Sequence, residues 1–395
     1  MRESSLPNET LALILADLPP AVLAIVARVS HRFNAVSERI LYTSATIIDL
    51  LSLSSPYPVR TLQWCEAMDK RVHLHEITRR VSIRWQVESR EPYTYPQPHP
   101  YLPHPALPTF AIQLGRTLHH LTLLESLDLF LGPANNSPER VHVIEHVIPA
   151  LRFTHLQHCS LGADWSKFTT PYSPLLSAFL LTHPSLRHLN FPDYYPHHHH
   201  NHYQQQSPLL APNALPNLSS FRGFADAAAL FLPGRPVHYL SLLGSDSDVT
   251  DDILAHITLT SIPLRFLDLS AMFVRPRLLR ILATRLPTIH SLRVRLALRH
   301  TLHYSMSGIR ILTGLSPVLS SFTHLSWLDL SPTDISSHYA SPATTGARRP
   351  DTDQDEVEHS LCREWARVCP ALRRVTFPSR NEWTNDDHGG WFVDT

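Results

Sequence analysis

The residues of this sequence with the greatest capacity for chemistry are a run of histidines, His197–His200, followed by His202. Imidazole is a good zinc ligand, so alternating histidines in an extended chain could share a metal ion. A structural or catalytic site, however, takes its ligands from separated positions and holds them with supporting hydrogen bonds. This run lies within the low-complexity stretch YYPHHHHNHYQQQSP. We therefore predict a solvated tract that binds metal only adventitiously, and no metal site.

Other local motifs of catalysis are missing from the sequence. It has no G-x-G-x-x-G or P-loop, no G-x-S-x-G, and no H-E-x-x-H, since HEITRR at His75 lacks the second histidine. A cysteine–histidine pair that meets only in space stays open. We expect no enzymatic activity and no cofactor. The cysteines are too dispersed for a disulfide framework or a metal knuckle, and we expect reduced thiols in the cytosol or nucleus; they are Cys65, Cys159, Cys362 and Cys369.

Arginine is concentrated between Arg265 and Arg310, where nine arginines accompany one acidic residue, Asp268. Guanidinium groups recognise carboxylates and phosphates bidentately, so this segment could bind an acidic or phosphorylated part of a target protein, with the acidic segment 351–358 as a competitor. In the alternative interpretation, the arginines coat exposed helices for solubility. The possible substrate face consists of Arg293, Arg295 and Arg299.

Bulk composition excludes several partners. Lys+Arg and Asp+Glu both number 34, so no overall field attracts nucleic acid or an anionic membrane. The apolar stretch 11–29 contains Asp17 and the pair Pro19-Pro20 near its centre, which disfavours a spanning helix. The start MRESSLPNET lacks the basic and apolar regions of a signal peptide. We expect no nucleic acid and no membrane as partners.

The N-terminal apolar residues have helical spacing instead. Asn8 is a suitable N-cap for a first helix, and Pro19-Pro20 ends that helix and begins a second. So short a bundle has more apolar positions than it can bury in itself, which indicates either a surface for a partner helix or a cap on the next domain. The spaced residues are Leu11, Ile14, Leu15 and Leu18, then Val22, Ile25, Val26 and Val29, then Phe33, Val36 and Ile40.

The order of these residues resembles an F-box, as found in fungal F-box proteins. The resemblance covers residues 4–48, from Leu6-Pro7-x-Glu9 through Val29-Ser30-x-Arg32-Phe33 to ILYTSATI. It implies that the module docks onto the Skp-type adaptor of a cullin–RING ubiquitin ligase. The residues that it implies form or support the docking surface are Leu6, Pro7, Glu9, Ile14, Leu15, Leu18, Leu23, Val29 and Phe33.

A leucine phrase, apolar-x-x-apolar-x-apolar, recurs along the rest of the chain. Its last two apolar positions share one face of a short strand, and helical segments follow at 252–261, 275–286, 308–322 and 358–369. RVSIRW (80–85) is a candidate opening strand. This alternation predicts a solenoid of parallel strands and outer helices, and it resembles the irregular leucine-rich repeats that often follow an F-box. The phrases begin at Leu124, Leu156, Leu186, Leu218, Val237, Leu264, Ile289, Leu325 and Leu372.

The expected fold is therefore α/β, a three-helix F-box module followed by an irregular leucine-rich-repeat-like solenoid. The implied function is substrate recognition in a Skp–cullin–F-box ubiquitin ligase, with an unknown protein substrate. The alternative is a repeat scaffold whose N-terminal helices are only a cap. The predicted organisation is module 4–48, linker or helix 49–74, solenoid 75–378 and tail or cap 379–395, with partly disordered insertions at 91–108, 192–216 and 332–357.

Overall fold

A computed structural model describes residues 6–52, 54–87, 105–133, 143–164, 173–192, 210, 214–297, 308–334, 352–386 and 389–394. The histidine run 197–202 and Arg299 lie outside these residues. The described residues fall into two compact units, residues 6–192 with 214–217, and residues 210 and 218–394. None of the described helices combines the length and hydropathy needed to span a membrane.

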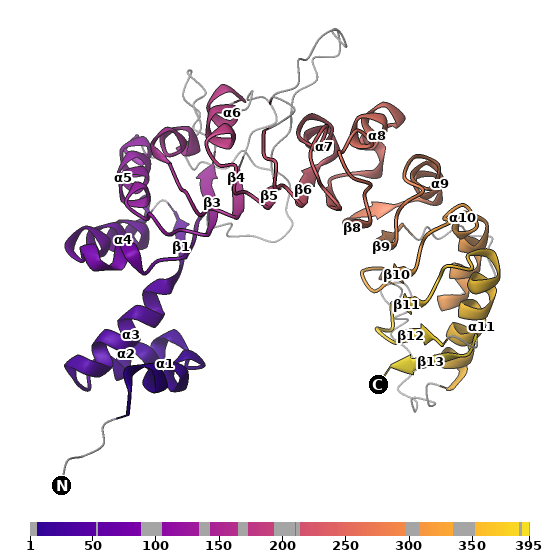
Figure 1. The fold of residues 1–395 in the computed structure, drawn as a ribbon, viewed down its shortest axis with the longest axis horizontal. Helices are drawn as coiled ribbons and strands as arrows, with labels where there is room; N and C mark the ends of the chain where they lie inside the picture. Colours follow the sequence, from indigo (N-terminus) through magenta and orange to yellow (C-terminus); the bar gives the residue numbers. More distant parts are fainter. Residues whose placement is uncertain are drawn as a thin grey trace. The chain divides into compact units, whose positions relative to one another are not determined.

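The first unit begins with three short helices (Figure 1). Pro20 stands in the first turn of the second helix, where its missing N–H costs nothing. Ser30 caps the third helix by accepting the amide hydrogen of Phe33 at 3.3 Å. Asn8 is not the predicted N-cap; it is the first helical residue, and its side-chain oxygen accepts from Arg32 Nε at 2.8 Å. The helices are α1 (Asn8–Ala16), α2 (Pro20–Val26) and α3 (His31–Thr43).

These helices enclose a small core of their own. Each contributes to it, and α3 contacts both α1 and α2. Fully burying one such aliphatic side chain stabilises a fold by about 1.5–3 kcal/mol, so a few residues hold the module together. The buried core residues are Leu11, Leu15, Leu23 and Val36, against which Ala12, Leu18, Val26, Phe33, Ile40 and Leu41 pack.

The remainder of the first unit is a parallel sheet with helices on one side (Figure 1). Its strands follow one another in chain order: β1 (Ser44–Leu51), β2 (Arg80–Val87), β3 (Ser126–Pro133), β4 (His158–Asp164) and β5 (His188–Phe191). The helical elements between them are α4 (Val59–Lys70), η1 (Val72–Glu76), α5 (Leu107–His119), η2 (Val143–His146), η3 (Ile148–Ala150) and α6 (Ser173–Leu181).

The second unit repeats this plan and ends in a hairpin. Its parallel strands are β6 (Ser220–Phe224), β7 (Tyr239–Leu243), β8 (Phe266–Val274), β9 (Ser291–Leu296), β10 (Trp327–Asp329) and β11 (Arg374–Thr376), and the antiparallel β12 (Glu382–Asn385) and β13 (Trp391–Asp394) follow. Its helices are α7 (Ala225–Phe231), η4 (Asp246–Asp248), α8 (Asp251–Ile257), α9 (Pro276–Arg285), η5 (Gly308–Leu315), α10 (Ser316–Leu319) and α11 (Thr352–Val368).

The leucine phrase marks the strands from β3 to β11, which confirms the predicted repeat. Each of these strands begins two residues after its phrase begins, and the first residue of every phrase is at most 2% exposed. In seven of these phrases the carbonyl of the second residue accepts two amide hydrogens from the next phrase; that of Arg265, for example, accepts from His290 at 2.8 Å and Ser291 at 3.0 Å. These phrases are therefore held in register with the next, as where Leu240, Leu267 and Leu292, each the fourth residue of its phrase, stack in the core.

The array begins earlier than predicted. Its opening strand is β1, not RVSIRW, so residues 44–48 belong to the sheet, and α4 in the predicted linker is a helix of the first repeat. Burial alternates along β1, with Ile47, Asp49 and Leu51 inside. Asp49 tolerates burial because its carboxylate accepts the amide hydrogens of Arg60 at 2.8 Å and Thr61 at 3.0 Å.

Two predicted insertions are shorter than expected at their C-terminal ends. The stretch 91–108 runs into α5, which begins at the buried Leu107, and the stretch 332–357 runs into α11, which begins at Thr352. In the tail, β12 and β13 bring Trp383 and Trp391 into buried positions. The hairpin therefore closes the end of the second unit's sheet, as a repeat array requires.

Candidate protein-interaction surfaces

The helical module exposes large apolar side chains that its core leaves out. They are between 38% and 75% exposed, although each is a leucine, isoleucine or valine. An excess of exposed apolar side chains on a small module is typical of a protein-interaction site. We call these residues the module surface: Leu6, Leu13, Ile14, Val22, Ile25 and Val29.

The structure separates the predicted docking residues into two groups. Four belong to the module's interior: Leu15 and Leu23 are buried, and Leu18 and Phe33 pack against them. The other five are exposed, namely Leu6, Pro7, Glu9, Ile14 and Val29. The first group can support a docking surface, and the second can contact a partner directly.

Sequence reasoning did not assign Leu13, Val22 or Ile25 to a surface. It placed Val22 and Ile25 in the apolar stripe of the second helix, whereas α2 turns Leu23 and Val26 toward the core. The sequence does indicate that some of these residues are exposed, because α1 and α2 have more apolar residues than one stripe of each helix can bury.

A second exposed surface lies on the solvent side of the strands in the second unit. Tyr239 of β7 and Phe266 of β8 are register partners, with ring centroids 6.4 Å apart and about a third of each side chain exposed. The Tyr239 hydroxyl donates to Asp268 Oδ2 at 3.3 Å. Burial, followed by the nearby Asp268 carboxylate, raises the pKa of Tyr239, so the phenol remains a hydrogen-bond donor at neutral pH.

This strand surface continues to the end of the sheet. The guanidinium of Arg374 lies 5.4 Å from the ring centroid of Trp327, and its Nε lies 3.1 Å from a carboxylate oxygen of Glu382. The Trp327 indole N–H donates to Thr376 Oγ1 at 3.3 Å. Fixed tyrosine, tryptophan and arginine side chains are the residue types that dominate binding energy at protein interfaces.

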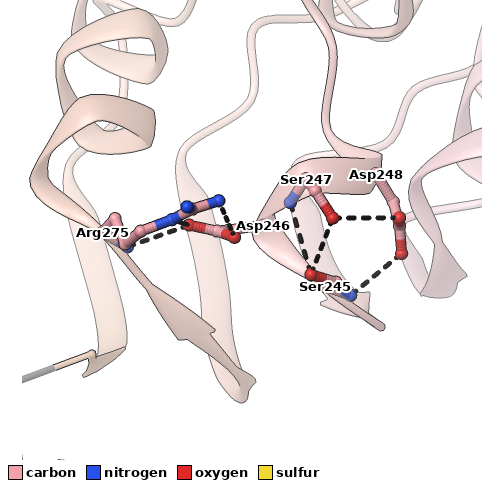
Figure 2. Close-up of polar contacts among 5 residues, drawn as sticks. All are labelled: Ser245, Asp246, Ser247, Asp248 and Arg275. Carbon is pink, nitrogen blue, oxygen red and sulfur yellow. Dashed lines mark hydrogen bonds and ion pairs between the residues drawn. The ribbon is translucent and has the colours of Figure 1, made fainter.

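Three arginines of the arginine-rich segment pair with carboxylates that lie outside it in the sequence. Arg275 binds Asp246 through three hydrogen bonds, from its guanidinium Nε at 2.6 Å and Nη2 at 2.7 Å and from its backbone amide at 3.2 Å (Figure 2). Arg285 pairs with Asp251, and Arg293 with Asp329. At these positions the arginines connect neighbouring repeats, and the binding of an acidic partner by Arg293, Arg295 and Arg299 stays a prediction. The hydrogen bonds from Arg275 hold the pKa of Asp246 below its ordinary value.

The turn that carries Asp246 is itself fixed (Figure 2). Ser245 and Asp248 form a capping box, in which the Ser245 amide donates to the Asp248 carboxylate at 3.0 Å. Gly244, directly before this turn, has φ +101°, and a Cβ there would lie 2.8 Å from the Phe224 ring. Glycine is therefore needed where β7 passes into the turn.

Arg295 and the acidic segment 351–358, which were predicted to bind an acidic target and to compete with it, respectively, have contacts within the fold. Arg295 places its guanidinium 4.1 Å from the ring centroid of Phe273. In the acidic segment, Asp355 accepts from Asn381 at 3.0 Å, and the fully buried Glu358 accepts from the Trp383 indole at 2.9 Å. These acids therefore hold the C-terminal hairpin.

No cluster of three potential metal ligands occurs among the described histidines, cysteines and acids. The four cysteines are free and buried. Burial raises the pKa of Cys65 to about 11, and it raises the pKa values of Cys159, Cys362 and Cys369 as well. Their thiols are therefore protonated at neutral pH and behave as small apolar residues.

No protein-family model matches the sequence, and no curated protein matches it. Structural comparison finds the leucine-rich repeat-containing protein LegL7 from Legionella pneumophila, at a TM-score of 0.36 and 14% identity over 73% of this chain and 90% of that chain. It also finds a structure of the Rad7 and Elc1 complex in yeast, at 0.31 and 12% over 89% and 90%. A protein from Bacteroides fragilis matches at 0.32 and 12% over 75% and 76%.

The class of protein follows from the register described above. A phrase of apolar residues that recurs strand after strand, with parallel pairing and a helical element after most strands, defines an α/β repeat protein of the leucine-rich-repeat kind. Three helices precede its first strand and carry the module surface.

Proposed function

We propose that this chain is the substrate-recognition subunit of a Skp–cullin–F-box ubiquitin ligase. In this proposal, α1–α3 dock onto the Skp-type adaptor and the repeats bind a target protein. The observation that carries it is the module surface, where Leu13, Ile25 and Val29 are each at least 66% exposed beside a core that is complete without them. Water contact at so many aliphatic side chains is unfavourable, and a partner surface would remove it.

The module is also connected in a way that suits an adaptor. α3 passes directly into β1, and Glu38 of α3 binds both Arg71, which precedes η1, and His73 of η1, the latter at 3.3 Å. A partner bound to the module would therefore be linked to the first repeat without a long flexible loop. Ubiquitin transfer needs this property, because the ligase acts by holding the target near the charged ubiquitin carrier, and the chain itself would catalyse nothing.

The strand surface of the second unit is the best candidate for the target site. It combines exposed Tyr239 and Phe266 with the ordered Asp268 carboxylate and the Trp327–Arg374 pair. The reduced cysteines support a cytosolic or nuclear location, where such ligases act.

One observation favours the alternative, a repeat scaffold with an N-terminal cap. The same continuity of α3 with β1 places the helices where a cap would cover the edge strand of the first sheet. A cap, however, needs an apolar face only toward the sheet, and Ile14 and Ile25 are exposed to water.

Co-expression with the Skp-type adaptor separates these two functions. We expect the wild-type chain to co-purify with the adaptor in a one-to-one complex and the variant Ile14→Asp/Ile25→Asp to elute alone. The matched control is Val72→Asp/Leu259→Asp, which changes two equally exposed aliphatic residues outside the module and should leave the complex intact. A folded wild-type chain that ignores the adaptor would favour the cap.

A further inference from the structure

A small side chain lies between two large aromatic ones on the strand surface of the second unit. Phe266 of β8, Ser291 of β9 and Trp327 of β10 are register partners on three consecutive parallel strands. The next residue of each strand is a buried leucine, so these three side chains lie on the opposite, solvent side of the sheet. We call the three residues the aromatic bracket.

Each aromatic ring of the bracket is supported on the side away from Ser291. The ring of Tyr239, on the neighbouring strand β7, lies 6.4 Å from the Phe266 ring, centroid to centroid. The guanidinium of Arg374, on the neighbouring strand β11, lies over the Trp327 ring at 5.4 Å from its centroid. The remaining side of each ring therefore borders the space above Ser291.

This space has the width of one flat side chain. Neighbouring strands lie about 4.8 Å apart, so Phe266 and Trp327, with one strand between them, start from backbones about 9.6 Å apart. A ring that packs between two others needs about 3.5–4 Å on each side, or about 7–8 Å in all. Ser291 is too short to fill the space between the rings, and Phe266 is 37% exposed. A ring of a ligand can therefore reach both walls.

An arginine without an acidic partner lies beside the bracket. Arg265 directly precedes Phe266, and its side chain is exposed. Its carbonyl accepts the amide hydrogens of His290 at 2.8 Å and Ser291 at 3.0 Å, which places Arg265 at the edge of the sheet next to the bracket. Within the described part of the chain, no carboxylate lies at ion-pair distance from Arg265. Its charge is therefore available to a ligand.

The acids of the same sheet face have partners of their own. Asp329 lies 3.1 Å from Nε of Arg293, and Glu382 lies 3.1 Å from Nε of Arg374. The oxygens of Asp268 accept hydrogen bonds from three neighbouring groups. A carboxylate supplied by a ligand therefore displaces no acid of the protein when it pairs with Arg265.

We propose that the aromatic bracket binds an extended segment of the target protein, in which an aromatic side chain enters between Phe266 and Trp327 and a neighbouring aspartate or glutamate pairs with Arg265. Aromatic rings attract one another in stacked and edge-to-face arrangements, and a ring enclosed in this way loses its contact with water. Guanidinium binds a carboxylate bidentately, which fixes the orientation of the segment as well as its charge.

Other ligands match these features less well. A base of single-stranded nucleic acid could also stack between the rings. Each nucleotide adds a phosphate, however, and the carboxylates of Asp268, Asp329 and Glu382 lie on the same face and repel it. A purely apolar segment would leave Arg265 without a counterion. An aromatic residue next to an acidic one uses both the bracket and the arginine.

This inference rests on the proposed function, because the target supplies the segment. Its test uses the full chain and the capped peptide Ala-Asp-Phe-Asp-Ala, whose NMR signals are followed during a titration. Aspartate on both sides makes the probe independent of the direction of the bound segment. We expect saturable binding that is at least about fivefold tighter than that of Ala-Asn-Phe-Asn-Ala or Ala-Asp-Ala-Asp-Ala. Added sodium chloride should weaken the aspartate peptide more than the asparagine peptide.

Variants then locate the site. Phe266→Ala removes one wall and Ser291→Leu fills the space, and each should weaken binding of the Asp-Phe-Asp peptide about fivefold or more. These changes act on different strands, so a folding defect in one variant leaves the other as the test. Arg265→Gln should weaken the Asp-Phe-Asp peptide and leave the Asn-Phe-Asn peptide unchanged. The matched control Arg277→Gln removes an exposed arginine of α9 and should change neither.

Three results would overturn the assignment. They are no saturable binding of the Asp-Phe-Asp peptide by the wild-type chain, equal affinities of Arg265→Gln and Arg277→Gln for that peptide, and tighter binding of a single-stranded oligothymidylate that is lost in Phe266→Ala. Co-purification with the Skp-type adaptor is measured on the same variants and should be unchanged, because it depends on α1–α3. A failed peptide site and a failed adaptor function therefore give different results.

Discussion

Ile14 and Leu15 are adjacent in α1 and lie in opposite environments: Ile14 is 56% exposed, whereas Leu15 is 5% exposed in the core of the helical module. Docking and folding can therefore be separated by substitutions one residue apart. A charge at Leu15 would unfold the module, whereas a charge at Ile14 would change only its surface.

Leu15→Ala should destabilise the module by about 2–5 kcal/mol, since it leaves a cavity among Leu11, Leu23 and Val36. Ile14→Asp should change stability by about 0.5 kcal/mol or less, as is usual for exposed positions. Hydrogen exchange of the α1–α3 amides measures both. Equal loss of protection in the two variants would show that Ile14 belongs to the core.

Gly244→Ala should destabilise the second unit by more than about 1 kcal/mol. Alanine disfavours φ +101°, and its methyl group would lie 2.8 Å from Phe224. Gly314→Ala is the matched control, because a Cβ there meets nothing within 4 Å. Denaturant midpoints compare the two, and an unchanged midpoint for Gly244→Ala would contradict the described turn.

The buried His183 should make the first unit sensitive to acid. Its Nε2 accepts the Phe153 amide hydrogen at 3.0 Å and its Nδ1 donates to the Phe179 carbonyl at 2.6 Å, so the fold binds the neutral ring. Burial lowers the pKa of His183 below 6.5. The unfolded chain then binds more protons, and this contribution is present above pH 6.5 and is lost as the pH falls below it.

The variant His183→Asn isolates this effect from the other histidines. It should be less stable than the wild-type chain at pH 7.5, because the Phe153 amide loses its acceptor, and this difference should shrink at pH 5.5. Urea unfolding at the two pH values gives the comparison. A difference in stability that stays constant with pH would rule out titration of His183.

The Glu358 carboxylate should be needed to keep the C-terminal hairpin closed. It is fully buried and accepts from Ser379 at 2.7 Å, Asn381 at 3.0 Å and Trp383 at 2.9 Å. Glu358→Ala leaves these donors without their acceptor, which costs about 1–3 kcal/mol for each group that stays buried. A red shift of tryptophan fluorescence would report the opened hairpin, and the exposed Glu356→Ala should show none.

The leucine phrase located the strands from β3 to β11 because their core positions are almost all apolar and evenly placed. The leucine phrase did not predict β1 and its repeat, and the reason is physical. Its core includes Asp49, whose burial depends on the amides of Arg60 and Thr61 eleven and twelve residues away, and the next repeat begins on the buried Thr78 rather than on an aliphatic residue. Polar residues that are satisfied inside a fold look like surface residues in a sequence.

The residues of the interaction surfaces could likewise be predicted only in part from the sequence. The excess of apolar residues in α1 and α2 predicted either a docking surface or a cap, but which of these residues are exposed depends on how α2 packs against α3. The partners of Arg275 and Arg293 lie 29 and 36 residues away, at Asp246 and Asp329. Counting charge within the arginine-rich segment therefore overestimated its net charge. The position of Ser291 between Phe266 and Trp327 needs the register of β8, β9 and β10 and could not be seen at separations of 25 and 36 residues.

The most direct measurement is the dissociation constant of the full chain with the Skp-type adaptor, determined by calorimetry for the wild type, Ile14→Ala/Ile25→Ala and the control Val72→Ala/Leu259→Ala. If the module surface is the docking site, the first variant should lose about 2 kcal/mol or more, which corresponds to at least about thirtyfold weaker binding, while the control stays unchanged. Equal affinities for all three proteins, or no binding by the wild type, would contradict the adaptor function.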